Sequence, residues 1–281
     1  MRPGAFARHR RPSLRIALYS HDTMGLGHVR RNLLIAGALT RAPLHAEVLL
    51  ITGIREAGAF TMAPGIDCLT LPAYAKSPNG SYGPRSLRMA TDSLVALRSR
   101  TIDAALTQFQ PHLLIVDNVP RGAMSELDRT LDRLARERRT RCVLGLRDIL
   151  DDAAVVRAQW QAADHLRVVT EAYDAVWVYG SPLICDAARE YGFPQRLTEK
   201  VHYLGYLDHR RRLEATGPDL VPAVAAETVC CVGGGQDGMA LARAFAAAEL
   251  PSVERAALIC GPFMPPAHRT ALAQVVGQRS D

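Results

Sequence analysis

The chain has 281 residues, of which 48% are hydrophobic, 22% charged and 6% aromatic. This composition is that of an ordinary globular protein, and it excludes a disordered chain, a collagen-like repeat and a disulfide-stapled miniprotein. The formal net charge is +6, so a nucleic acid or an anionic membrane has to be considered as a partner.

Most of this charge lies near the N-terminus. The first 41 residues contain eight Arg against one acid, Asp22, which gives eight minus one, or +7, and leaves −1 for the rest of the chain. A nucleic-acid footprint spread over a surface is therefore not expected. We predict a basic flexible tail over residues 1–14, with peripheral contact at the cytoplasmic face of the inner membrane as an open alternative.

Targeting and cysteine patterns indicate a cytoplasmic protein. The basic start is followed by only four apolar residues, Ile16–Tyr19, which is too short for a secretory signal, and the sequence has no apolar run long enough to span a bilayer. The six cysteines form no C-x-x-C pair, which predicts reduced core thiols and no zinc site.

Short branched apolar runs alternate with segments of helical period, which predicts an α/β fold with parallel sheets. A helix is expected over 121–139, with Leu127, Leu131 and Leu134 on its buried face. The glycine-rich segment 72–85 is too long for a simple connection and is expected to cover a substrate. The predicted strands span residues 15–19, 46–51, 66–71, 112–117, 141–146, 174–179, 200–204, 227–232 and 256–260.

The sequence changes character after the seventh strand. Residues 208–225 contain three consecutive Arg, two Pro and no clear period, which predicts a linker. We therefore expect a first Rossmann-like domain over 15–207 and a second over 226–281. Both begin with a strand that runs into a glycine-rich turn and a helix, the second helix lying near 239–248.

The first glycine-rich turn contains Gly25, Gly27 and His28. Unpaired backbone N–H groups and the positive end of a helix dipole suit a phosphate or a polar substrate there, with Arg30 and Arg31 placed to meet an anion. Because Arg30 stands where a dinucleotide fingerprint has its third glycine, a nicotinamide or flavin cofactor is not expected.

The second turn is the stronger phosphate-binding candidate. Gly233, Gly234 and Gly235 directly follow a strand, and Gln236 and Asp237 come next. Adjacent glycines permit the backbone to approach a diphosphate closely. The alternative is a tight turn that binds no ligand.

Three residues are candidates for catalysis. His28 lies in the first turn of a helix, where the dipole favours a neutral imidazole that can act as a general base; its alternative role is a local helix cap. His21, at the end of the first strand, is the rival base. Asp117 ends a strand at the sheet edge where such folds bind ligands, with helix capping as its alternative.

Several motifs carry a resemblance to a known family. The stretches are Gly25–His28, Arg30–Asn32, Val143–Asp151, Tyr203–Leu207 and Gly233–Gln236. Together they resemble GT-B glycosyltransferases of family 28, which contains the lipid-intermediate N-acetylglucosaminyltransferase of peptidoglycan synthesis, and especially its uncharacterised "predicted glycosyltransferase" branch.

This resemblance implies two Rossmann-like domains and an inverting transfer that needs neither metal nor cofactor. His28 would deprotonate an unknown acceptor hydroxyl, and the second glycine turn would stabilise the diphosphate of a nucleotide sugar, expected to be UDP-linked. Residues 226–281 are short for a complete donor domain, so we expect a second domain that is truncated, with activity impaired. A nucleotide-sugar epimerase on the same fold and a non-catalytic ligand-binding module remain the alternatives.

Overall fold

The computed structural model describes residues 13–21, 25–76, 81–210, 226, 228–249 and 255–277. The expected basic tail lies almost wholly outside the described residues, and so does most of the expected linker. The domain boundaries drawn from the sequence stay a prediction.

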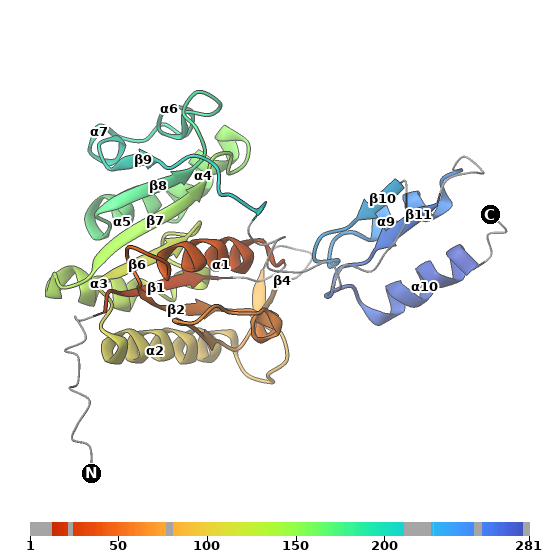
Figure 1. The fold of residues 1–281 in the computed structure, drawn as a ribbon, viewed down its shortest axis with the longest axis horizontal. Coiled ribbons are helices and arrows are strands. Elements are labelled where there is room, and N and C mark those ends of the chain that lie inside the picture. Colours follow the sequence, from red (N-terminus) through yellow and green to blue (C-terminus); the bar gives the residue numbers. More distant parts are fainter. Residues whose placement is uncertain are drawn as a thin grey trace, which may run out of the picture.

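The larger part of the described chain is built on a seven-stranded sheet in which all neighbouring strands run parallel, in the order β3-β2-β1-β6-β7-β8-β9 (Figure 1). The α/β class with parallel sheets, predicted from the apolar runs, is confirmed. The observed strands differ from the predicted ones by one residue at most at either end. They are β1 (Arg15–Ser20), β2 (Glu47–Thr52), β3 (Ile66–Thr70), β6 (Leu113–Asp117), β7 (Arg141–Arg147), β8 (Ala175–Tyr179) and β9 (Val201–Tyr203).

Helices connect the strands and cover both faces of the sheet. The α-helices of this part are α1 (Gly27–Leu39), α2 (Thr91–Phe109), α3 (Asp128–Glu137), α4 (Ala153–Ala162), α5 (His165–Ala172), α6 (Ala187–Glu190) and α7 (Gln195–Thr198), and the short 3-10 helices are η1 (Arg55–Ala59) and η2 (Ala123–Ser125). Alternate residues of β1 point to opposite faces. Leu18 packs in the cluster that contains Ile35 of α1, while Tyr19 packs in the one that contains Ile102 of α2. Helices α1 and α2 therefore pack on opposite faces of the sheet.

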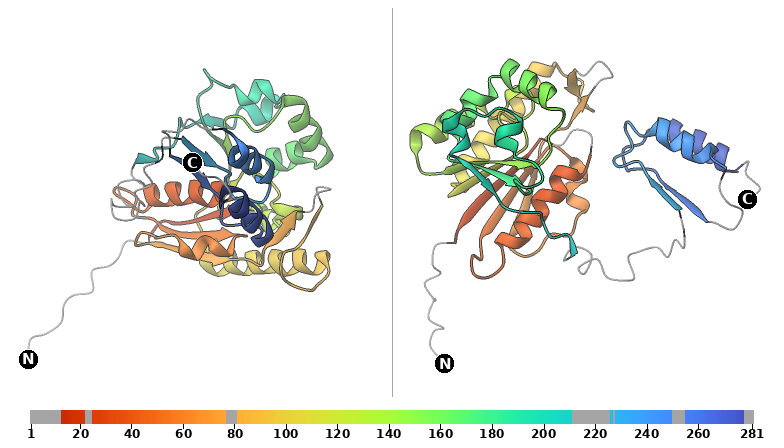
Figure 2. Two further views of the ribbon diagram at one scale, coloured as in Figure 1. Left: turned by 90° about the vertical axis from the view of Figure 1, so that its right-hand side faces the viewer. Right: turned by 90° about the horizontal axis from the view of Figure 1, so that it is seen from above.

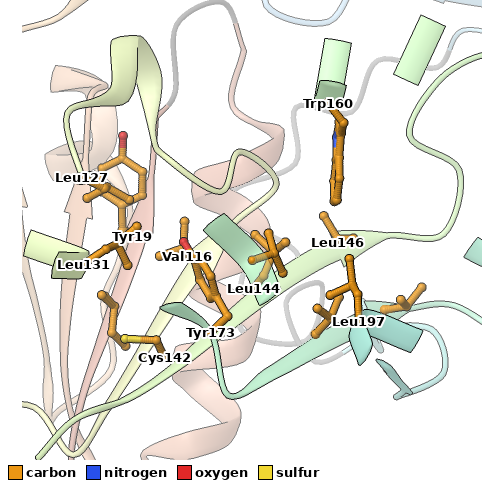
Figure 3. Packing of buried hydrophobic residues seen from close by; sticks show 14 of the residues in the cluster. Tyr19, Val116, Leu127, Leu131, Cys142, Leu144, Leu146, Trp160, Tyr173 and Leu197 are labelled. Atoms are coloured by element: carbon orange, nitrogen blue, oxygen red, sulfur yellow. The ribbon is translucent and has the colours of Figure 1, made fainter. Parts of the chain in front are cut away.

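The main core lies between the sheet and the helices opposite α1. Val116, Leu144 and Leu146 of the central strands are fully buried there, and they pack with side chains such as Trp160 and Tyr173 from α4 and the end of α5 (Figure 3). Because both faces of the central strands are covered, these strands are continuous apolar runs. This is why their positions could be predicted from the sequence.

The helix expected over 121–139 is shorter than predicted. Helix α3 spans only Asp128–Glu137 and is preceded by η2, because Gly122 and Met124 have positive φ values of 69° and 54°, which a continuous right-handed helix excludes. Leu127, Leu131 and Leu134 are nevertheless buried in the main core, as the periodicity predicted.

The segment 72–85 contains a short antiparallel hairpin of β4 (Tyr74–Lys76) and β5 (Tyr82–Pro84). Its first strand is anchored by a buried charge pair. Arg98 donates to both carboxylate oxygens of Glu126, at 2.5 and 2.7 Å, and both side chains have no exposed surface. The hydroxyls of Tyr74 and Tyr19 also donate to this carboxylate, and Arg98 donates to the carbonyl of Pro72. The pair thus joins the hairpin to α2, β1 and the loop after β6.

The C-terminal part forms a separate small sheet. Strands β10 (Thr228–Cys231) and β11 (Ala256–Ile259) pair in parallel, and helices α9 (Met239–Ala247) and α10 (Pro266–Gly277) pack against each other and against a small core around Cys230 and Ala242 (Figure 2). The predicted strands and helix of this region are confirmed.

One loop of the small sheet contacts the larger one. Phe263 packs against the cluster of Val29, Ile54 and Ala57, and the guanidinium of Arg85 lies 5.6 Å from the centre of its ring. Because Val29 follows His28 in α1 and the Phe263 N–H donates to the carbonyl of Gly234, this contact links the two glycine-rich turns.

Breaking the buried pair is expected to destabilise the protein strongly. Replacement of Arg98 by Met leaves the Glu126 carboxylate buried without its charge partner, and the free energy of unfolding should fall by about 3–5 kcal/mol. Urea denaturation measures the change. Arg129→Met is the matched control, because Arg129 also pairs with a carboxylate but is 67% exposed, and its loss should be about 1 kcal/mol or less. Equal losses in the two variants would contradict the role given to the buried pair.

Candidate functional site

The candidate site lies where the carboxyl ends of β1 and β6 meet the start of α1. These strands are neighbours in the sheet, so the last residue of β6, Asp117, lies beside the first turn of α1. The Nδ1 atom of His28 is 2.5 Å from one carboxylate oxygen of Asp117, and a guanidinium nitrogen of Arg31 is 2.7 Å from the other. His28 and Arg31 share one face of the helix because they are three residues apart.

The Asp117 carboxylate has no exposed surface. Burial by itself raises the pKa of this carboxyl, but the hydrogen bonds and positive charges of His28 and Arg31 outweigh burial and lower the pKa below its ordinary value. Asp117 is therefore ionised at neutral pH. Since an ionised carboxylate can only accept hydrogen bonds, the Nδ1 atom of His28 carries a proton and its N–H donates the hydrogen bond to Asp117.

His21 lies next to this pair. Its ring centre is 4.7 Å from that of His28. Burial, followed by the charges of His28 and Arg98, lowers the pKa of His21 to about 3, although Asp117 acts in the opposite direction. His21 is therefore neutral throughout the physiological range. Its Nδ1 atom is buried and makes no hydrogen bond among the described residues.

The structure thus brings together His28, Asp117 and His21, which were proposed separately from the sequence. It also excludes the capping role that was the alternative for two of them. Helix α1 has no side-chain cap hydrogen bond, so His28 is not a helix cap. The Asp117 carboxylate binds His28 and Arg31, so it is not the N-cap of the next helix, which was its alternative role.

The two arginines of the first turn differ in their surroundings. Arg31 forms an ion pair with Asp117, whereas it was expected to meet an anionic ligand. Arg30 points elsewhere: it is exposed, and its guanidinium lies 5.8 Å from the ring centre of Phe60. Among the described residues, and apart from chain neighbours and the helix's own backbone, no atom lies within 4 Å of a side-chain carbon built at Gly25 or Gly27.

The second glycine turn contains two residues with positive φ values. Gly233 and Gly235 have φ values of 60° and 89°, a region that other residues rarely adopt. Gly235 is also packed so closely that an added side-chain carbon would lie 2.9 Å from Met264. Gln236 and the exposed Asp237 follow, before α9, which lacks a side-chain cap. Its first backbone N–H groups are therefore not capped by a neighbouring side chain.

The described residues include no group of three or more His, Cys, Asp or Glu placed to hold a metal ion. Among the described helices, none combines the length and the apolar character needed to cross a membrane. The sequence missed two features, the ion pair of Arg31 with Asp117 and the buried ion pair of Arg98 with Glu126. Only the tertiary structure brings these partners together.

Neither family models nor curated proteins give a match to this chain. Solved structures with a similar fold include the calicheamicin glycosyltransferase, with 16% identity, coverage of 92% of this chain and 68% of that one, and a TM-score of 0.49. MurG from Acinetobacter baumannii has 13% identity, coverage of 94% and 65%, and a TM-score of 0.41. A UDP-GlcNAc 2-epimerase from Neisseria meningitidis bound to UDP-GlcNAc has 9% identity, coverage of 95% and 70%, and a TM-score of 0.46. The chain spans about two thirds of the length of these proteins.

The depressed pKa of His21 predicts a loss of stability in acid. The pKa of His21 is about 3 in the folded chain and 6.5 ordinarily, so between these values the unfolded chain binds one more proton. Stability from the neutral ring is complete above pH 6.5 and is lost as the pH falls towards 3, by up to about 1.4 kcal/mol per pH unit. Urea denaturation of wild type and His21→Gln between pH 7 and 4.5 should show this steeper decline in the wild type alone. If the free energy of unfolding depends on pH in the same way in both proteins, the lowered pKa of His21 is contradicted.

Proposed function

We propose that this protein is a glycosyltransferase that moves a sugar from a nucleotide-sugar donor to an acceptor hydroxyl with inversion and without a metal ion. The observation that carries the proposal is the hydrogen bond between His28 and the buried Asp117, at the carboxyl edge of a parallel sheet. Such edges are where open α/β sheets bind ligands.

His28 is suited to the role of general base. Asp117 engages Nδ1, so Nε2 is the ring nitrogen left to take a proton from the acceptor hydroxyl. The ionised carboxylate also stabilises the imidazolium that forms as the proton moves. The deprotonated acceptor oxygen then attacks the anomeric carbon, and the bond from that carbon to the nucleotide diphosphate breaks. His21 is less suited to act as the base, because its burial disfavours the protonated form that a base must reach.

The second glycine turn is suited to the donor diphosphate. Its positive φ angles and the uncapped start of α9 allow backbone N–H groups of Gly233–Asp237 to face an anion. These groups would stabilise the charge of the departing nucleotide diphosphate, so the transfer itself requires no metal. Phe263 packs beside Val29 of α1 and its N–H donates to the carbonyl of Gly234. These contacts support an approach of the second glycine turn to His28. The donor is proposed to be UDP-linked, as the family resemblance implies.

For the acceptor, the proposal is supported only by the arrangement of the elements around His28. The hairpin β4–β5 follows the carboxyl end of β3, at the edge that carries His28, and the buried pair beneath it holds its first strand in place. We propose that this hairpin forms part of the acceptor site, in agreement with the expectation drawn from its length and composition.

The donor half of the proposal is tested by titration calorimetry with a panel of nucleoside diphosphates. We expect binding of UDP at millimolar concentration or below, and a preference for UDP over the other bases. Absence of heat with every nucleotide at millimolar concentration would exclude both a transferase and a nucleotide-sugar epimerase for this chain.

The catalytic half is tested with His28→Ala and Asp117→Asn. Both should lower turnover of the donor by about 10² to 10⁴-fold while leaving nucleotide binding unchanged, because neither residue belongs to the second glycine turn. Release of UDP from UDP-sugars in the presence of candidate acceptors measures turnover. If His21→Ala abolishes turnover and His28→Ala does not, the base assignment is wrong. Conversion of the sugar without transfer would identify an epimerase, and nucleotide binding without any turnover would identify a binding module.

The second glycine turn is tested by Gly235→Ala. The substitution forces a side chain into a left-handed conformation and against Met264, which should distort the turn and weaken binding of UDP by at least about tenfold, equivalent to about 1.4 kcal/mol. Gly277→Ala is the matched control, since Gly277 ends α10 with open space around it and should bind UDP as the wild type does. Equal affinity in both variants would contradict a role for the turn.

A further inference from the structure

We propose that Arg31, seated against Tyr179, is a positioning residue that keeps Asp117 ionised and turned toward His28. The inference rests on the proposed function of His28 as a base and adds to it a second helix residue. From the sequence, Arg31 was expected to meet an anionic ligand instead.

The buried negative charge of Asp117 needs a permanent positive partner. A carboxylate without exposed surface is stable only when it is paired and hydrogen-bonded. A histidine is positively charged only part of the time, and as a base in its resting state it must be neutral. Arg31 is charged at every accessible pH. Its contact with the second carboxylate oxygen, at 2.7 Å, therefore compensates Asp117 whether or not His28 carries its extra proton.

The two contacts also fix the orientation of Asp117. His28 and Arg31 approach different oxygens of the same carboxylate, so the plane of the carboxylate is fixed by two contacts. One helix supplies both of them. Rotation of Asp117 away from His28 would break the ion pair with Arg31, which makes the orientation of the His28 ring depend on Arg31.

Arg31 is itself supported from beneath. Its guanidinium lies 5.8 Å from the ring centre of Tyr179 on β8, a distance suited to a cation–π contact. Tyr179 reaches this position because its hydroxyl lies directly over Gly145 of β7, where any side chain would collide with it. Burial, followed by the charge of Asp117, raises the pKa of Tyr179, so the ring stays neutral. This gives a structural reason for the glycine in the motif Val143–Asp151.

The other groups around the carboxylate do not replace Arg31. His21, which follows β1, is neutral. From α2, Arg98 is paired with Glu126. From β8, Tyr179 is neutral, and its hydroxyl makes no hydrogen bond among the described residues. Asp22 lies outside the described residues. Arg31 is thus the permanent cation that touches Asp117 in the described part of the chain.

The experiment is nuclear magnetic resonance of the wild-type protein and its variants, with labelled carboxyl carbons and imidazole nitrogens. In Arg31→Gln the Asp117 carboxyl should titrate at higher pH than in the wild type, and His28 should lose its preference for the tautomer with the proton on Nδ1. Arg31→Lys retains the charge and should keep the Asp117 titration close to that of the wild type. Arg30→Gln is the matched control, one residue away on the same helix but directed at Phe60, and should change neither signal.

Unchanged titration of Asp117 and an unchanged His28 tautomer in Arg31→Gln would overturn the proposal. So would an equal change in Arg30→Gln, which would show a general effect of helix charge. If Arg31→Gln does not fold, Gly145→Ala tests the proposal instead. This substitution displaces Tyr179 and should also raise the pKa of the Asp117 carboxyl. An unchanged pKa of Asp117 in Gly145→Ala also overturns the proposal. Neither readout needs turnover, so loss of the proposed transferase function and failure of this inference are distinguishable.

Discussion

The candidate site depends on one buried carboxylate. Asp117 ends a central strand, has no exposed surface, and is stabilised by His28 and Arg31 from one face of α1. A buried charge that lost these partners would be costly, so the strand, the helix and the two side chains have to keep their relative positions. The same interaction that stabilises the fold locally therefore orients the histidine for proton transfer.

A second buried ion pair, between Arg98 and Glu126, holds together the elements next to Asp117. Arg98 and Glu126 connect α2 with the loop after β6, and the hydroxyls of Tyr19 and Tyr74 complete the hydrogen bonding of the carboxylate. Tyr19 lies two residues before His21, and Tyr74 begins the hairpin at the edge of the site. This pair thus fixes the elements on the side of the sheet opposite α1, while the positive charge of Arg98 contributes to keeping His21 neutral.

The two glycine-rich turns have different physical roles. In the first, Gly25 and Gly27 have open space around them among the described residues, and the important side chains follow on the helix. In the second, Gly233 and Gly235 adopt backbone conformations that side chains oppose, and Gly235 is closely packed against the loop that carries Phe263. Phe263 in turn packs beside Val29, which connects a candidate phosphate turn to the helix that carries the candidate base.

The strands and the class of sheet could be predicted from the residues alone, because central strands buried on both faces are apolar runs such as Leu113–Val116 and Val143–Leu146. His21 and Asp117 were predicted because they lie at the ends of strands, and His28 because it lies in the first turn of a helix. Which of these side chains contact one another depends on the packing of the folded chain. The ion pair of Arg31 with Asp117 spans 86 residues and that of Arg98 with Glu126 spans 28, and local sequence carries no signal for such distant partners. The break before α3 was likewise decided by backbone angles at Gly122 and Met124 that helical periodicity does not reveal.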